Sequence, residues 1–176
     1  MDLILETLTP ESFSEFGQVI DADNSANNFL INGGSTRRFH DLADTEVIGD
    51  AKAGVSIFRG EARKLPMAIT MLERHPYGSQ AFMPLQQQPY LIVVAPSLNK
   101  DQPDLDKLRL FYAKGNQGIN YARGTWHHPL LALHNESDFL VIDRIGEGHN
   151  CDEFDFPNDC NIHIDDMNFD NNIDER

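Results

Sequence analysis

Hydrophobic residues along this chain come in short runs of four to seven residues, many of them β-branched. Between the runs lie segments rich in glycine, proline and asparagine, as at residues 32–34, 75–78 and 115–118. Short apolar runs with frequent turn signals are typical of an antiparallel sandwich or barrel. We therefore predict a mainly β fold, with strands at residues 3–7, 55–58, 66–71, 90–95, 108–112, 130–133 and 139–142.

Two short helical segments are predicted beside these strands. Thr9 is a suitable N-cap residue, Pro10 fits the first helical position, and Gly17 is a suitable stop about two turns later. Residues 104–107 follow a proline and have the composition of a single helical turn. The expected domain is therefore an antiparallel β structure with few and short helices.

Length and composition fit one globular domain. The chain has 176 residues, of which 40% are hydrophobic and 24% are charged, and both values are ordinary for a soluble protein. No apolar run approaches the roughly 20 residues of a membrane-spanning helix. The N-terminal residues lack the pattern of a secretory signal. Cys151 and Cys160 are the only cysteines, too few for a disulfide framework, so we expect a cytoplasmic protein.

Charge and missing motifs exclude several classes of function. Acidic residues outnumber basic ones by 28 to 14, for a net charge of −14, so nucleic acid and anionic membranes are not expected partners. Glycine-rich nucleotide loops and nucleophile elbows are missing from the sequence. Residues 151–176 hold nine acidic residues and one basic residue. We predict one domain over residues 1–157 and a flexible acidic tail over residues 158–176.

The first candidate for chemistry is the segment that runs from Glu73 to Gln80. Side chains alternate between the two faces of a strand, so Glu73 and His75 point to the same side. A carboxylate beside an imidazole can ligate a metal ion or act as an acid–base pair. Gln80 can add an oxygen ligand or an amide for a substrate. Spacing alone also fits a strand edge that runs into a solvated turn, and by itself favours that interpretation.

The second candidate is the run Trp126-His127-His128-Pro129, which contains the only tryptophan. Adjacent histidines in an extended chain point to opposite faces, so at most one of them faces a given interior. One histidine can then enter a cavity while the other packs at a rim or an interface. The alternative is a structural pair of histidines around a buried tryptophan.

Two further segments place arginine where it can bind an anion. Near Asn32, two glycines allow close approach of the backbone, and Arg38 can hold a carboxylate through two hydrogen bonds. A hairpin with a surface arginine is the alternative interpretation. Asp143 and Arg144 end an apolar strand, and here a salt bridge between the two is favoured over an anion site.

Taken in order, these segments make the sequence similar to the ureidoglycolate lyase family of allantoin breakdown, also called ureidoglycolate hydrolase. The blocks Glu73-Arg74-His75-Pro76 and Trp126-His127-His128-Pro129 carry the resemblance together, since either block alone is less specific. The resemblance covers roughly residues 1–155, with further matching stretches at residues 16–20, 38–43, 103–105, 118–121, 142–144 and 150–152.

The resemblance implies a cupin-like, jelly-roll β-barrel that works as a homodimer and splits (S)-ureidoglycolate into glyoxylate and urea. It also implies a divalent metal ion, with nickel as the candidate. Cupins hold a metal with a His-x-His pair, a glutamate and a last histidine, and the corresponding positions here are Glu73, His75, Gln80 and His127. This set has fewer imidazoles than usual and should bind metals more weakly. A metal-free acid–base mechanism therefore stays open.

The substrate that the resemblance implies is an anion, so the pocket of this acidic protein needs local positive charge. We expect Arg38, Arg59 or Arg144 to hold the substrate carboxylate, in that order of preference. The predicted catalytic residues are Glu73, His75, His127 and His128, and the predicted substrate-binding residues are Asn32, Arg38, Arg59, Gln80, Tyr121 and Arg144.

Three other functions fit the same residues. One is a metal-dependent cupin oxygenase or isomerase that acts on another small carboxylic acid. Another is a hydrolase that releases ammonia in place of urea. The third is a non-catalytic cupin that binds a small acid. Cleavage of a C–N bond by elimination requires no covalent intermediate, which agrees with the missing nucleophile elbow.

Overall fold

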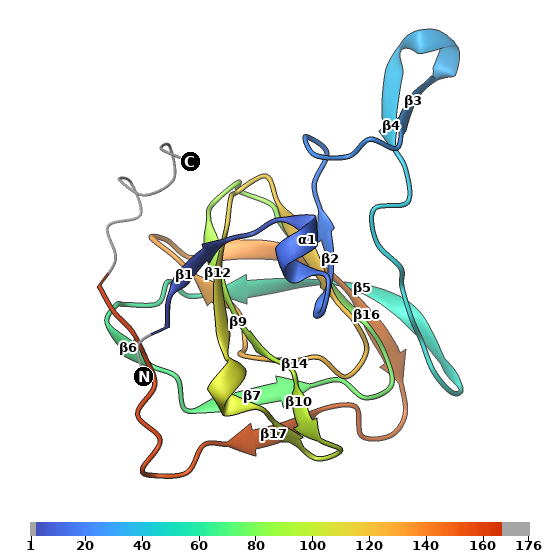
Figure 1. The fold of residues 1–176 in the computed structure, drawn as a ribbon. Coiled ribbons are helices and arrows are strands. Elements are labelled where there is room, and N and C mark those ends of the chain that lie inside the picture. The colour runs from blue at the N-terminus through green and yellow to red at the C-terminus, as the bar shows by residue number, and fades with distance from the viewer. Residues whose placement is uncertain (1–2, 167–176) are drawn as a thin grey trace.

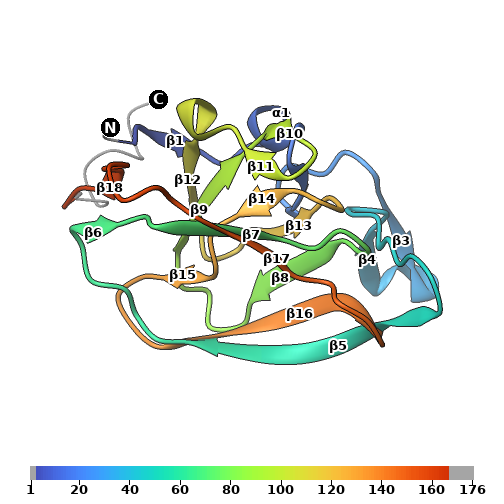
Figure 2. The same ribbon diagram turned by 90° about the horizontal axis from the view of Figure 1, so that it is seen from below.

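A computed structural model describes residues 3–166 and shows a mainly β protein with one α-helix in that part of the chain. Two mostly antiparallel sheets face each other, and a hairpin projects away from them (Figures 1 and 2). No helix in the described range is long and apolar enough to cross a membrane. The prediction of a mainly β fold is confirmed, and the arrangement is consistent with a cupin-like jelly roll.

Within residues 3–166, the strands form two large sheets and three small ones. The seven-stranded sheet has the order β1 (Leu5–Thr7), β12 (Arg109–Ala113), β9 (Tyr90–Ala95), β14 (Trp126–His127), β7 (Met71–Arg74) and β17 (Asp152–Asp155), with β15 (Leu131–Ala132) also paired to β9. The five-stranded sheet has the order β2 (Gly17–Ile20), β13 (Gly118–Tyr121), β8 (Gln80–Pro84), β16 (Ser137–Gly146) and β5 (Ala51–Gly60). The pairs are β3 (Asn28–Ile31) with β4 (Thr36–Phe39), β6 (Met67–Ala68) with β18 (His163–Ile164), and β10 (Ser97–Asn99) with β11 (Gln102–Pro103).

Strand pairing does not close the two large sheets into one barrel within residues 3–166. The pairing in both is antiparallel except between β1 and β12, which run parallel. The domain is therefore built as two facing layers with a core between them, as in a sandwich.

The central strand β9 explains how both faces of the seven-stranded sheet are covered. All six of its residues are buried, and alternation divides them between two hydrophobic clusters. Tyr90, Ile92 and Val94 face the five-stranded sheet and form part of the inner core. Leu91, Val93 and Ala95 belong to an outer core that also contains Leu72 and Trp126.

Both ends of the described chain cover this outer core. Leu3, Ile162 and Ile164 are buried in it, and β18 pairs with β6. The packed part of the chain therefore extends to Ile164, into the range 158–176 that we predicted as a flexible tail. Residues 167–176 of that predicted tail lie outside the described residues.

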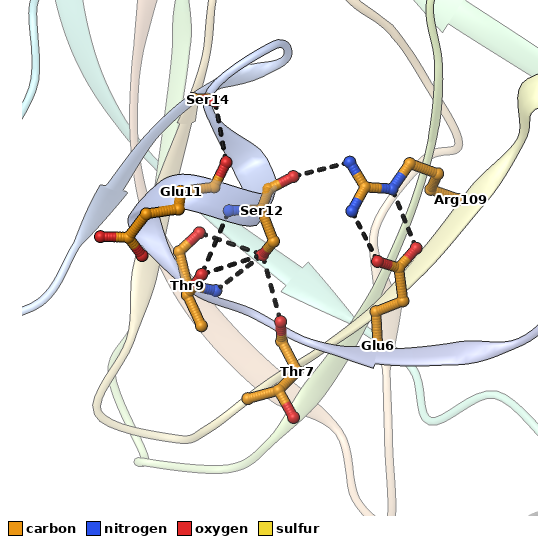
Figure 3. Close-up of polar contacts among 7 residues, drawn as sticks. All are labelled: Glu6, Thr7, Thr9, Glu11, Ser12, Ser14 and Arg109. Atoms are coloured by element: carbon orange, nitrogen blue, oxygen red, sulfur yellow. Dashed lines mark hydrogen bonds and ion pairs between the residues drawn. The ribbon is translucent and has the colours of Figure 1, made fainter.

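The N-terminal segment follows the predicted capping, but its helix is shorter than expected (Figure 3). Helix α1 (Pro10–Phe13) begins after Thr9, whose hydroxyl accepts a hydrogen bond of 3.1 Å from the backbone N–H of Ser12. The helix ends at Phe13 and not near Gly17, which instead begins β2 with a φ of 149°. A Cβ at Gly17 would overlap the backbone carbonyl of Asn120, so this glycine is required by the close approach of β2 to β13.

The two 3₁₀ segments are equally short. One, η2 (Leu105–Lys107), lies within the predicted single turn. The other, η1 (Asn32–Gly34), forms the tip of the hairpin made by β3 and β4. Figure 1 shows this hairpin extending away from the body of the protein, and every residue of β4 is exposed.

Candidate functional site

Two neighbouring strands of the seven-stranded sheet bring Glu73 and His127 together. The two residues are direct partners across the antiparallel pair of β7 and β14, so their side chains share one face of the sheet. His127 Nε2 lies 3.5 Å from Glu73 Oε1, and the His127 side chain is only 2% exposed. The register of two strands that are far apart in sequence thus creates the central contact of the site.

His75 and Gln80 complete this cluster. His75 follows the end of β7, two residues after Glu73, and its Nε2 atom lies 3.1 Å from Gln80 Oε1 at the start of β8. Glu73, His75 and His127 each offer a potential ligand atom, and these three atoms lie within 4.8 Å of one another. All four residues predicted as metal ligands therefore meet in one place, which we call the Glu–His cluster (Glu73, His75, Gln80 and His127).

The two histidines of the cluster are oriented by backbone carbonyls. His127 Nδ1 lies 2.9 Å from the carbonyl of Thr125, and His75 Nδ1 lies 2.7 Å from that of Asn150. Because a carbonyl can only accept, each Nδ1 carries a proton and donates it, which leaves a lone pair on Nε2 of the neutral ring. His127 Nε2 is buried without a hydrogen-bond partner among residues 3–166. This orphaned atom suits a metal ion or a donor group of a ligand.

Aromatic and imidazole rings surround the cluster. The Tyr121 ring stacks on His127, with 4.0 Å between centroids and 14° between planes. Tyr121 is 6% exposed, and burial raises the pKa of its phenol well above the usual value, so it is a neutral wall of the site. His128 borders the same small gap as His127 and Tyr121, although the side chains of consecutive residues in an extended chain point to opposite faces.

Burial and neighbouring groups set the protonation of the cluster. Burial raises the pKa of the Glu73 carboxyl, but His127, His75 and the Cys151 thiol together outweigh it, and the net pKa lies below its usual value. Burial also lowers the pKa of His75 and of His128. Near neutral pH, Glu73 is therefore an ionised carboxylate, while His75 and His128 are neutral.

Residues 150 and 151 contribute contacts that the sequence analysis did not assign. The Cys151 thiol donates to Glu73 Oε2 at 3.7 Å. Its pKa is raised to about 11, first by burial and then by the charge of Glu73, so it stays protonated. Asn150 supplies the carbonyl that orients His75. The only signal for them was that residues 150–152 form one of the stretches that match the family.

A cavity of about 350 Å³ opens from the cluster toward the surface. Glu73 and Gln80 border it, together with Arg59 and Arg63. The Arg59 guanidinium holds both oxygens of Asp138, at 2.7 and 2.9 Å. Within the described chain no ion pair engages Arg63. Arg63 is therefore a second cation at the cavity, and it was not among the predicted substrate-binding residues.

The other predicted arginines lie elsewhere in this chain. Arg38 sits over the Phe29 ring, 6.0 Å from its centroid, on the projecting hairpin, and Asn32 lies at the tip of that hairpin. Arg144 donates to the backbone carbonyls of Ile48 and Glu147. The cluster and its cavity therefore receive none of these three predicted substrate-binding residues from the same chain.

The predicted salt bridge between Asp143 and Arg144 is wrong. Consecutive residues of β16 point to opposite faces of the sheet, so the two side chains separate. Asp143 turns inward and accepts a hydrogen bond of 3.4 Å from Gln80 Nε2. Arg144 turns outward, to the groove that it lines with Tyr77.

The fold and the site together define a class: a small two-layered β protein with a buried carboxylate–imidazole cluster at the base of a cavity. Such a cluster suits acid–base or metal-assisted chemistry on a small molecule. Comparison with known proteins narrows this class. A family model described as ureidoglycolate lyase matches residues 1–163, and the chain belongs to this family.

Curated relatives agree with the family match. The chain is 55% identical over 152 residues to a ureidoglycolate lyase of Pseudomonas savastanoi pv. phaseolicola, covering 86% of this chain and 88% of the relative. It is 53% identical to that of Pseudomonas entomophila over 156 residues, with 88% and 92% coverage. For Pseudomonas syringae pv. tomato the identity is 50% over 164 residues, with 93% and 95% coverage.

Proposed function

We propose that this protein is a carbon–nitrogen lyase that cleaves (S)-ureidoglycolate into glyoxylate and urea, as a step of allantoin breakdown. The observation that carries the proposal is the convergence of Glu73, His75 and His127 within 4.8 Å in a member of this family. The cavity beside the cluster, about 350 Å³, is of a size that suits a small ligand.

In the substrate, one carbon atom bears a carboxylate, a hydroxyl and a ureido group. The reaction requires one proton to leave the hydroxyl oxygen and one to reach the ureido nitrogen. The hydroxyl loses its proton as its oxygen becomes the carbonyl of glyoxylate. The C–N bond breaks with its electron pair moving to nitrogen, which takes up a proton and leaves as urea. Glu73 is a half-buried, ionised carboxylate and is the proposed base. Proton transfer of this kind typically contributes about 10²–10⁴-fold to the rate.

His127 is the proposed proton carrier between Glu73 and the leaving nitrogen. Its Nδ1 atom is held by the Thr125 carbonyl, while Nε2 lies 3.5 Å from Glu73 and can accept and return a proton. The stacked Tyr121 ring keeps the imidazole in place and excludes water from one face. His75, fixed by the Asn150 carbonyl, provides a second neutral imidazole.

As the alternative to this metal-free proton transfer, we propose that the cluster binds a divalent metal ion, with nickel as the candidate. The donor set of one carboxylate, two imidazoles and the Gln80 oxygen fits such an ion, and the orphaned Nε2 atom of His127 is the observation that supports it. When bound, the ion would polarise the substrate oxygens and lower the pKa of the hydroxyl.

For the substrate carboxylate we propose Arg63, with Arg59 beside it. Both border the cavity that Glu73 also borders, whereas Arg38 and Arg144 lie outside it. The Arg59 guanidinium is already held by Asp138, so Arg63 is the arginine with donors available for a two-pronged contact.

The test is to incubate the protein with fresh ureidoglycolate, with and without added Ni²⁺, and to measure urea, glyoxylate and ammonia after subtracting spontaneous decay. We expect urea and glyoxylate in equal amounts. Ammonia in their place would favour a hydrolase. Binding without product would favour a small-acid-binding protein, and consumption of oxygen with another small acid would favour an oxygenase.

We further propose a homodimer. On the outer face of the five-stranded sheet, Val55 and Ile57 of β5 are 70% and 54% exposed. They are in register with Ile142 and Leu140 of β16, so that two apolar rows run across the strands. No described element covers this face (Figure 2). A second copy with the same surface provides a self-complementary partner around a two-fold axis.

We also propose that the protein works in the cytoplasm. Cys151 and Cys160 are both free thiols, and free thiols without disulfides are typical of proteins in a reducing compartment. Cell fractionation with a cytoplasmic marker enzyme tests this location. Recovery with a secreted marker would contradict it.

A further inference from the structure

Asp143 is a carboxylate on β16 that lies beside the Glu–His cluster and has no part in the proposed reaction. The inward-facing residues Phe139 and Val141 of the same strand are buried in the core, and alternation puts Asp143 on that face. Its Oδ2 atom accepts from Gln80 Nε2 at 3.4 Å. Its Oδ1 atom is buried without a hydrogen-bond partner among residues 3–166. The amide of Gln80 is thus the polar group that Asp143 contacts.

The Gln80 amide has a donor end and an acceptor end, and its orientation decides which end the cluster receives. An ionised carboxylate only accepts hydrogen bonds. Asp143 therefore holds the NH₂ end, and Gln80 Oε1 is left facing His75 Nε2, 3.1 Å away, which is also an acceptor when Nδ1 carries the proton. The reverse orientation would place the amide oxygen against the carboxylate. The Gln80 side chain is 5% exposed, so water cannot relieve that repulsion.

We propose that Asp143 is a positioning residue: its carboxylate orients the Gln80 amide so that oxygen, and not nitrogen, faces the Glu–His cluster. The cluster then presents acceptors only, from Glu73, Gln80 and the Nε2 atoms of the two histidines. Such a set binds a cation or the N–H groups of a ureido substituent and would be disrupted by an inward-facing NH₂. The catalytic consequence rests on the proposed function, whereas the orientation itself does not.

The first test compares Asp143→Asn in two backgrounds, with Gln or with Glu at position 80. An asparagine at 143 can donate as well as accept, so it allows the Gln80 amide to reverse. The two oxygens of a glutamate carboxylate at position 80 are equivalent, so Asp143 is not needed to orient this side chain. We expect Asp143→Asn to lower the Ni²⁺ affinity of the protein about 10-fold or more with Gln80. With Gln80→Glu already in place, the same change should not lower the affinity.

The second test needs no metal and no substrate. In ¹⁵N-labelled, metal-free protein, the side-chain NH₂ signals of Gln80 are identified as those missing from Gln80→Glu. We expect them to exchange slowly with solvent in the wild type and to shift in Asp143→Asn. Asp155→Asn, an exposed carboxylate on β17, is the matched control, and thermal unfolding shows whether each variant folds.

Two results would overturn the inference. One is an equal loss of Ni²⁺ affinity from Asp143→Asn in both backgrounds, which would indicate a merely structural role. The other is a Gln80 NH₂ group whose exchange and chemical shift do not respond to the change. A wild-type protein that releases no urea or binds no Ni²⁺ would contradict the proposed function or the proposed metal, while the NMR result would still decide the role of Asp143.

Discussion

At the scale of single residues, the site depends on a charged group held where water is scarce. Glu73 is partly buried. Burial raises the pKa of its carboxyl, but the imidazoles and the thiol around it lower that pKa by more. Both imidazoles are in turn fixed by backbone carbonyls, those of Thr125 and Asn150. The chemistry therefore belongs to an arrangement of residues and not to one of them.

Replacing Glu73 by glutamine should separate activity from stability. The substitution keeps the size of the side chain but removes the negative charge that accepts the proton. We expect urea release to fall about 10²–10⁴-fold, while the midpoint of thermal unfolding changes little. Glu15→Gln, at an exposed position, is the control. Unchanged urea release in Glu73→Gln would reject Glu73 as the base.

Asp21 provides a prediction about pH that is independent of the site. Asp21 as a whole residue is 4% exposed. Burial raises its pKa, but hydrogen bonds from Gln117 and Asn24 outweigh burial and lower the pKa overall. A carboxyl with a lowered pKa stabilises the fold above its unfolded value, near 3.9, and loses that contribution as the pH falls through the folded value.

We therefore expect Asp21→Asn to lower the free energy of unfolding by about 1–3 kcal/mol at pH 7. The difference from the wild type should shrink as the pH falls below about 4, because Asp21 itself becomes protonated. Urea unfolding at several pH values measures this. Asp23→Asn, at an exposed neighbouring carboxylate, is the control, and a difference that stays constant with pH would contradict the assignment.

At the scale of elements, strands differ in how well the local sequence predicts where they begin and end. The run at residues 90–95 became β9, because it is apolar on both faces and lies in the middle of a sheet. The strand predicted over residues 66–71 is wrong as one element. Met67–Ala68 pairs with the C-terminal β18, while Met71 begins β7. The two halves of this apolar run pair with different strands, β6 with β18 and β7 with β14 and β17, and the local sequence does not indicate these partners.

The short strand β18 should contribute to stability although it lies in an acidic segment. Ile164 is fully buried in the outer core. We expect Ile164→Ala to lower the free energy of unfolding by about 2–5 kcal/mol, since a cavity is left behind. Asp165→Ala, at an exposed position next to it, should change the free energy little. Chemical denaturation distinguishes the two, and equal effects would mean that β18 is not packed in solution.

At the scale of the whole molecule, the outer face of the five-stranded sheet exposes apolar side chains to water, with Val55 70% and Ile57 54% exposed. We expect the protein to sediment with about twice the mass of one 19.9 kDa chain, because its apolar rows bury each other. The net charge of −14 opposes this association, so the dimer should become tighter as salt is added.

Ile57→Lys tests this surface directly. The variant should sediment as a monomer at concentrations where the wild type is dimeric, since a lysine would be placed in the apolar row. Leu98→Lys, at a 61% exposed position on β10, should leave the dimer intact. Dissociation by both variants, or by neither, would argue against the β5 face as the interface.

The sequence by itself determined the features that depend on neighbours along the chain. Alternation along a strand put Glu73 and His75 on one side, and Thr9 and Pro10 fixed the start of α1. The family blocks also indicated His127 and Gln80. The predictions from alternation and capping succeed because both act over two to four residues, within reach of a local pattern.

Only the tertiary structure decided which distant residues meet. The pairing of β14 with β7 put His127 opposite Glu73, and the pairing of β16 with β8 brought Asp143 to Gln80. The same geometry brought Arg63 to the cavity and left Arg38 on the projecting hairpin. Strand register and the choice of partner are set by packing over the whole core, so no local pattern contains them.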